Sequence, residues 1–145
     1  MRGGKQSLNQ KIVITNDHSE KLSELLKVLR KNGYDVFLSP SNGKALLKAV
    51  EKEQPDILIT DAFMENFDIF GFLSAIGKRL SERGTKIFVK SALKSRCFEK
   101  KVLLSGADAY LLKPVDYRFI TGEKKRNDEE EKIGPFLFRR AVAHR

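Results

Sequence analysis

The stretch PDILITD, residues 55–61, places a short apolar run between a proline and an aspartate. Residues 57–60 are all apolar or β-branched, which is typical of a strand that is buried on both faces of a sheet. Because the residue before a proline avoids helical backbone angles, any upstream helix must end before Pro55. We therefore predict a buried strand over residues 57–60, with Asp61 directly at its carboxyl end.

Units of strand followed by helix repeat on both sides of this stretch. Short runs rich in β-branched and aromatic residues predict strands, and apolar residues spaced three and four apart predict helices with one buried face. This alternation is typical of an α/β fold in which right-handed crossovers connect a doubly wound, five-stranded parallel sheet and helices cover both faces. The predicted strands are residues 11–15, 34–38, 57–60, 86–89 and 109–112, and the predicted helices include residues 22–29, 45–50, 70–80 and 98–104.

The chain has 145 residues, 41% of them hydrophobic, which is enough for one domain with a core and a tail. Because it lacks both a long apolar run and the apolar segment of a signal peptide, we expect a cytoplasmic protein with no membrane partner. The single cysteine, Cys97, excludes an internal disulfide, and we place it in a helix core. We divide the chain into an N-terminal extension (1–10), one domain (11–121) and a tail (122–145).

The tail contributes to a net charge of +9, which bears on non-specific association with acidic partners or nucleic acid. Residues 123–132 are almost all charged and are predicted to form a solvated linker or an exposed helix. Residues 133–145 turn apolar and basic again. Three hypotheses remain for them: they fold back on the domain, dock on another subunit, or contact nucleic acid through their arginines.

Polar side chains follow four of the five predicted strands. The carboxyl ends of parallel strands meet at one edge of a sheet, where ligands bind at the switch in strand order, so we expect these side chains to converge. Each one taken singly is explained as a helix cap or a surface charge, but their joint placement indicates a site. The residues are Asn16 and Asp17 after the first strand, Asp61 after the third, Ser91 after the fourth and Lys113 after the fifth.

Four fragments at these strand ends carry a family resemblance: VITND (13–17), PDILITD (55–61), VKSA (89–92) and GADAYLLKP (106–114). In this order they resemble the CheY-like receiver domain of two-component response regulators, over about residues 10–117. The resemblance implies a flavodoxin-like fold with strand order 2-1-3-4-5. The fifth helix would be atypical or displaced, since few apolar residues follow Pro114 before Gly122.

The resemblance also implies a role for each site residue. Asp61 would accept a phosphoryl group, with Lys113 facing it as a cation on a cis Lys113-Pro114 bond. Ser91 would sense the phosphoryl group, and Tyr110 would follow it as a switch aromatic. A Mg²⁺ ion would be held by Asp17, Asp61 and the backbone carbonyl of Phe63, since magnesium prefers oxygen ligands.

The implied function is that of a receiver module in a phosphorelay. It would take its phosphoryl group from a histidine kinase or phosphotransfer protein and switch its affinity for a downstream protein target, with a homodimer as an option. Receiver domains catalyse only their own phosphorylation and dephosphorylation, so we do not expect an enzyme in the wider sense. The chemistry needs little covalent help, but the charge on the transferring group must be neutralised, which a metal ion and a lysine would do.

The sequence departs from the family pattern in and near the site. Asn16 stands where the family usually has an acidic residue, so it would be a weaker metal ligand, through its carbonyl oxygen or a bound water. In the loop after Asp61, Glu65 and Ile69 replace a common proline and glycine, which puts the loop shape in question. These departures favour a second hypothesis, a pseudo-receiver that serves as a phosphorylation-independent interaction or dimerisation module.

The sequence is also compatible with a nucleic-acid-binding regulator, which would use the basic tail, and with a flavodoxin-like cofactor binder. The acidic sequence NDHSE (16–20) argues against the cofactor binder, because it lacks the small residues that form a phosphate-binding nest. The sequence leaves open the cognate kinase, the output process, the oligomeric state and whether Asp61 is phosphorylated.

Overall fold

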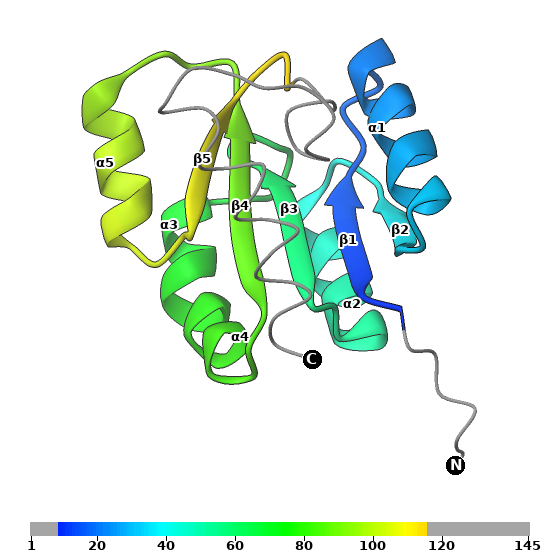
Figure 1. The fold of residues 1–145 in the computed structure, drawn as a ribbon. Coiled ribbons are helices and arrows are strands. Elements are labelled where there is room, and N and C mark those ends of the chain that lie inside the picture. Colours follow the sequence, from blue (N-terminus) through cyan, green and yellow to red (C-terminus); the bar gives the residue numbers. More distant parts are fainter. Residues whose placement is uncertain (1–8, 116–145) are drawn as a thin grey trace.

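A five-stranded parallel sheet forms the centre of the computed structural model, which describes residues 9–115 (Figure 1). The strand order is β2-β1-β3-β4-β5, which confirms the predicted topology. All neighbouring strands pair in parallel, so their carboxyl ends share one edge. The strands are β1 (Lys11–Thr15), β2 (Asp35–Ser39), β3 (Ile57–Asp61), β4 (Lys86–Ser91) and β5 (Ala109–Leu112).

Helices connect these strands and begin at side-chain caps. Ser19, Asn42, Asp68 and Ser95 each accept a hydrogen bond from a backbone N–H of the first helical turn, as favoured N-cap residues do. The predicted helix over residues 70–80 is present, with one π-helical segment inside it. The helices are α1 (Glu20–Lys31), α2 (Gly43–Glu53), the continuous run α3 (Ile69–Phe72), η2 (Leu73–Gly77) and α4 (Lys78–Glu82), and α5 (Arg96–Leu104).

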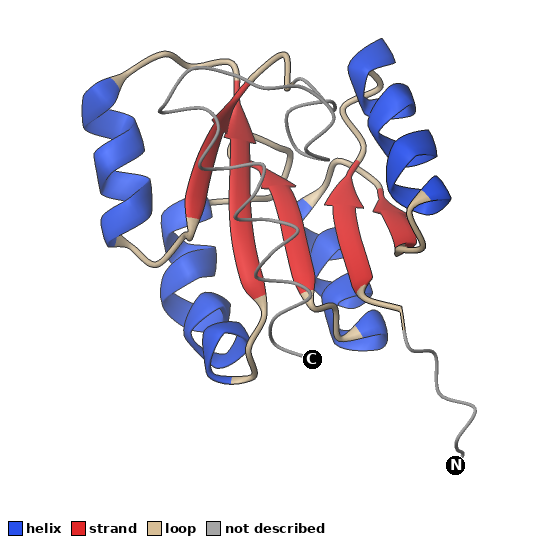
Figure 2. Ribbon diagram, in the orientation of Figure 1, coloured by secondary structure: helices blue, strands red, loops and turns tan. Residues whose placement is uncertain are grey.

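The helices cover both faces of the sheet and bury two apolar clusters (Figure 2). Helix α1 packs on one face through Leu22, Leu25 and Leu29. Helices α2 to α5 pack on the opposite face, and their apolar residues cluster with those of the sheet. Each cluster takes alternate residues of the strands, because successive strand side chains point to opposite faces.

This alternation decides which site residues share a face. Ile59 and Phe88 belong to the cluster under α1, so Asp61 and Lys90, each two residues further along the same strand, point to that face as well. Val89 belongs to the opposite cluster, and Ser91 follows it on that side. The carboxyl edge therefore presents charged groups on the α1 side.

Some expectations are corrected or lie outside the described part. Cys97 is exposed on α5 rather than buried. The face of α5 that packs on the sheet carries Val102, and Cys97 lies on another face of the helix. The Lys113-Pro114 bond is cis, as the resemblance implied. The fifth helix, the linker and the basic tail fall in residues 116–145, outside the described residues. Within residues 9–115, no helix has the length and apolar character needed to cross a membrane.

Candidate functional site

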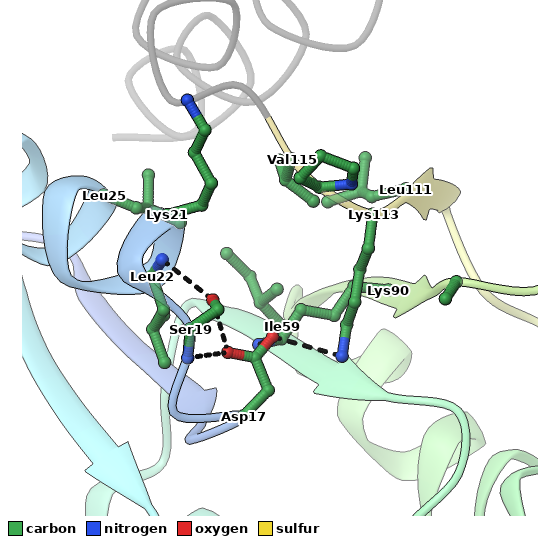
Figure 3. Close-up of a pocket in the computed structure, with 12 residues that line it drawn as sticks. Asp17, Ser19, Lys21, Leu22, Leu25, Ile59, Lys90, Leu111, Lys113 and Val115 are labelled. Atoms are coloured by element: carbon green, nitrogen blue, oxygen red, sulfur yellow. Dashed lines mark hydrogen bonds and ion pairs between the residues drawn. The ribbon is translucent and has the colours of Figure 1, made fainter.

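Two carboxylates and two ammonium groups meet at the carboxyl edge of the sheet. Lys113, just after β5, forms an ion pair with Asp61 Oδ1, and its Nζ lies 3.1 Å from Asp17 Oδ2. Lys90 reaches the same groups from β4, with its Nζ 3.1 Å from Asp17 Oδ2 and 3.6 Å from Asp61 Oδ2. Figure 3 shows both lysines approaching Asp17 from neighbouring strands. The predicted convergence of Asp17, Asp61 and Lys113 is present, with one additional cation.

The two oxygens of Asp61 have different surroundings. Oδ2 accepts a 2.6 Å hydrogen bond from the hydroxyl of Thr15, which in turn accepts one from the backbone N–H of Asp61. Oδ1 is buried and, within the described residues, has no hydrogen-bond partner, so its contact with Lys113 is an ion pair. Thr15 thus fixes the carboxylate through Oδ2, and Oδ1 faces the ammonium group of Lys113.

Asp17 is held in place by the turn that starts α1. Its Oδ1 accepts hydrogen bonds from both the backbone N–H and the hydroxyl of Ser19. Burial raises the pKa of Asp17, but the hydrogen bonds from Ser19 and the ammonium groups of Lys90 and Lys113 outweigh it and hold the pKa well below its usual range. Burial likewise lowers the pKa of Lys113, yet the carboxylates of Asp61 and Asp17 outweigh it and raise the pKa.

The lowered pKa of Asp17 predicts a loss of stability in acid. A group whose pKa is depressed by folding stabilises the folded state above its unfolded pKa of 3.8, and this contribution disappears as the pH falls below that value. We expect the free energy of unfolding of wild type to fall between about pH 5 and pH 2 more steeply than that of Asp17→Asn. Urea unfolding of both proteins across this range checks the prediction; parallel curves would contradict it.

Ser91 and Tyr110, the predicted switch residues, meet through the backbone of one residue. Ser91 Oγ accepts a 3.0 Å hydrogen bond from the N–H of Leu93, and the hydroxyl of Tyr110 donates a 2.6 Å bond to the carbonyl of Leu93. Both side chains are buried. The loop between β4 and α5 is therefore tied to both residues of the predicted switch.

Lys90 is the site residue that sequence reasoning missed. Its side chain is only 4% exposed, and its Nζ also donates a 2.9 Å hydrogen bond to the carbonyl of Thr15. A signal was present in the sequence: KIFVKS (86–91) has a lysine near the end of an otherwise buried strand, and a buried ammonium requires oxygen partners. Its spacing of two from Phe88 puts it on the same face as Asp61.

Other groups already engage the side chains that are predicted to hold magnesium. The side-chain oxygen of Asn16 accepts a 2.8 Å hydrogen bond from the N–H of His18, and Asp17 Oδ1 is engaged by Ser19. Phe63, whose backbone carbonyl is the remaining predicted ligand, lies two residues after β3, and its exposed ring stacks on Phe98. Residues 9–115 contain no group of three or more acidic, histidine or cysteine residues that could hold a metal ion. With two ammonium groups among two carboxylates, the residues present do not fit Mg²⁺.

A pocket of about 280 Å³ opens beside these charges, between α1 and the ends of β3 to β5 (Figure 3). Leucines of α1 and β5 form much of its wall, and Asp17, Lys90 and Lys113 form its charged end. The pocket is therefore apolar along most of its length and charged where it meets the site.

Comparison with known proteins agrees with the observed fold. A model of the response regulator receiver domain matches residues 12–122. The chain is 30% identical over 119 residues to the alkaline phosphatase synthesis transcriptional regulatory protein PhoP of Bacillus subtilis, a match that covers 81% of this chain and 48% of that protein. It is 29% identical over 105 residues to the transcriptional regulatory protein PdtaR of Mycobacterium tuberculosis, covering 72% of this chain and 50% of the relative. The chain thus spans about half the length of these curated relatives.

Solved structures share the fold at lower identity. The Francisella response regulator 1452 receiver domain superposes with a TM-score of 0.71 at 20% identity, covering 94% of this chain and 100% of that one. A CheY-like receiver domain protein from Methanospirillum hungatei gives a TM-score of 0.68 at 24% identity, covering 93% and 98%. Since the family model spans most of the chain and the described fold agrees with it, this chain belongs to the response regulator receiver domain family.

Proposed function

We propose that this receiver domain accepts a phosphoryl group on Asp61 from a histidine kinase or phosphotransfer protein and thereby changes its affinity for a protein partner. The observation that carries the proposal is the ion pair between the buried carboxylate of Asp61 and the partly exposed ammonium group of Lys113 at the carboxyl edge of the sheet. A carboxylate beside a fixed cation is suited to phosphoryl transfer, in which positioning and charge stabilisation supply most of the catalysis.

The geometry favours Oδ1 of Asp61 as the attacking atom, because Thr15 already occupies Oδ2. In the proposed step a bond forms between Oδ1 and phosphorus while the nitrogen–phosphorus bond of the phosphohistidine donor breaks, and the leaving imidazole takes a proton from solvent. Lys113 and Lys90 supply positive charge near the phosphoryl oxygens. Since Asp61 is 3% exposed, docking of the donor must open the pocket.

The proposed switch runs through Leu93. A new phosphoryl group would accept a hydrogen bond from the Ser91 hydroxyl, whose hydrogen is not used in the bond that Ser91 Oγ accepts from the Leu93 N–H. Movement of Ser91 would shift Leu93 and with it the partner of the Tyr110 hydroxyl. The surface around the β4–α5 loop would then change, which is how a local charge alters partner affinity.

Phosphoryl transfer predicts a mass increase that depends on Asp61. Incubation with phosphoramidate, a small donor with a nitrogen–phosphorus bond, is expected to add one phosphoryl group to wild type, as read by intact mass. Asp61→Asn should lose the adduct, because an amide is a poor nucleophile. Asp68→Asn is a matched control, since Asp68 caps α3 and asparagine is an equally good cap. The reaction is run in parallel with Mg²⁺ and with EDTA.

Absence of an adduct in wild type under both conditions would remove the phosphoacceptor role. The second candidate would then hold: a pseudo-receiver that binds its partner or a second copy without phosphorylation. Lys90 is the specific observation in its favour, because the ion pairs with Asp17 and Asp61 already neutralise the pocket. Such a module would keep its partner affinity when Asp61 is replaced by asparagine.

The remaining partner assignments are proposals from sequence. The matched relatives are named transcriptional regulators, and this chain spans about half their length, so their output is not carried over. We propose a division of the chain into an extension (1–10), a receiver domain (11–121) and a tail (122–145). The basic tail is a less favoured candidate for contact with nucleic acid. Deleting residues 123–145 should abolish any salt-dependent DNA affinity if the tail carries it.

A further inference from the structure

We infer that the ammonium group of Lys90 is the built-in cation of this acidic pocket and that the receiver site works without a divalent metal ion. The inference rests on the proposed function in that it concerns the same site around Asp61. It goes beyond that function by naming the cation that neutralises the site.

The contacts of Lys90 provide the first argument. Its Nζ lies among three oxygens from two segments, the end of β1 with the loop that follows it and the end of β3: 2.9 Å from the carbonyl of Thr15, 3.1 Å from Asp17 Oδ2 and 3.6 Å from Asp61 Oδ2. An ammonium group has three donors, and here each faces one oxygen. Carboxylate and carbonyl oxygens are also the ligands that magnesium prefers. Lys90 therefore places its charge where these oxygens converge.

The burial of Lys90 holds its ammonium group at this position, whereas an exposed lysine would sample several rotamers. Residue 90 pairs in register with Asp61 in the sheet, and its side chain is 4% exposed. To leave the pocket, the ammonium would have to give up two carboxylates in a region of low dielectric, which is costly for a buried charge. A metal ion therefore cannot enter simply by displacing a flexible surface lysine.

The charge of the pocket provides the third argument. Two carboxylates, Asp17 and Asp61, face two ammonium groups, Lys90 and Lys113, so the formal charge of the four groups is zero. A divalent cation would raise the formal charge of the pocket to +2. It would also be repelled by the buried ammonium group of Lys90, and dissolved salt screens such a buried interaction only weakly. Asn16 adds no negative charge to offset this, and its oxygen is bonded to His18.

The test titrates Mg²⁺ alone into the full chain and follows binding by calorimetry. Wild type is expected to show no saturable binding up to about 10 mM, which is well above the roughly 1 mM dissociation constants of the weakest protein calcium sites. Lys90→Met keeps the side-chain volume and removes the charge, and it should bind Mg²⁺ at least about tenfold more tightly than wild type. Lys86→Met, the same substitution at the opposite end of β4, should behave as wild type.

A fourth protein separates the effect of Lys90 from the effect of Asn16, which replaces the usual acidic residue. Asn16→Asp restores a carboxylate while Lys90 remains, and we expect it to bind Mg²⁺ more weakly than Lys90→Met. Saturable binding by wild type that Lys90→Met leaves unchanged would overturn the inference. It would also be overturned if Asn16→Asp alone restored binding as fully as Lys90→Met, or if Lys90→Met bound no better than wild type.

The metal titration needs no phosphodonor, so the two proposals fail in different ways. A wild-type chain that binds no Mg²⁺ and also takes no phosphoryl group would keep the inference and lose the proposed phosphoacceptor function. A chain that takes a phosphoryl group only when Mg²⁺ is bound would keep the function and lose the inference. Equal adduct formation in EDTA and in Mg²⁺ supports both.

Discussion

Replacing Lys90 with methionine is expected to lower the free energy of unfolding by roughly 3–5 kcal/mol in metal-free buffer, the range found when one partner of a buried ion pair is removed. The physical reason is that the carboxylates of Asp17 and Asp61 would lose one of their two cations, while the carbonyl of Thr15 would lose the hydrogen bond from Lys90. Urea unfolding of wild type and Lys90→Met at neutral pH measures the difference.

The control for this result is Lys86→Met, which removes a lysine of the same strand away from the site and should cost less than about 1 kcal/mol. A double-mutant cycle with Asp17→Asn tests whether the loss is electrostatic. In the Asp17→Asn background, Lys90→Met should cost less than in wild type, by at least about 0.5 kcal/mol, because the two groups are in contact. Equal costs for Lys90→Met and Lys86→Met would contradict the prediction.

Gly43→Ala is expected to be the second large perturbation, with a cost of about 3 kcal/mol, the upper part of the usual range for overpacking. A Cβ at residue 43 would lie 1.8 Å from the carbonyl oxygen of Asn66 and 2.8 Å from its carbonyl carbon. These are backbone atoms of the loop after Asp61, which cannot rotate away as a side chain can. The Gly43 N–H also donates a 2.8 Å hydrogen bond to the carbonyl of Glu65, so the clash would break this bond.

The matched control is Gly77→Ala, where the added Cβ would meet the side chain of Leu73 at 3.4 Å, an ordinary contact. Because residue 77 is helical, alanine there should be neutral or stabilise by up to about 1 kcal/mol. Thermal unfolding of both variants checks the pair. Similar melting temperatures for the two variants would contradict the prediction, because they would mean that the loop after Asp61 moves to accommodate the new Cβ at residue 43.

The contact at Gly43 also explains the shape of the loop after Asp61. Glu65 and Ile69 replace residues that the family commonly has, so the sequence leaves the loop shape undecided. In the structure Glu65 forms an isolated bridge with Asn42, and Asn66 takes the left-handed conformation that asparagine tolerates. The bridge between Glu65 and the distant residue Asn42 fixes the shape of this loop. The local sequence pattern does not predict such a contact.

The fold was largely predictable because its signals are local. Strand runs and helical spacing located each element to within a few residues, and short connections leave few topologies for alternating strands and helices. The exceptions are the π-helical segment within residues 70–80 and the exposure of Cys97. Both depend on how a helix rotates against the sheet, which is settled by packing between segments that are far apart in sequence.

The sequence by itself determined that Asp17, Asp61 and Lys113 would stand at one edge of a parallel sheet, because each lies at or just after the end of a strand. Only the tertiary structure decided the charge balance of that edge. Lys90 lies inside a strand, and its ammonium becomes a site group only because β4 pairs in register with β3 and brings it to Asp61 and Asp17. The meeting of buried charges depends on strand register and side-chain reach, and these are properties of the assembled sheet.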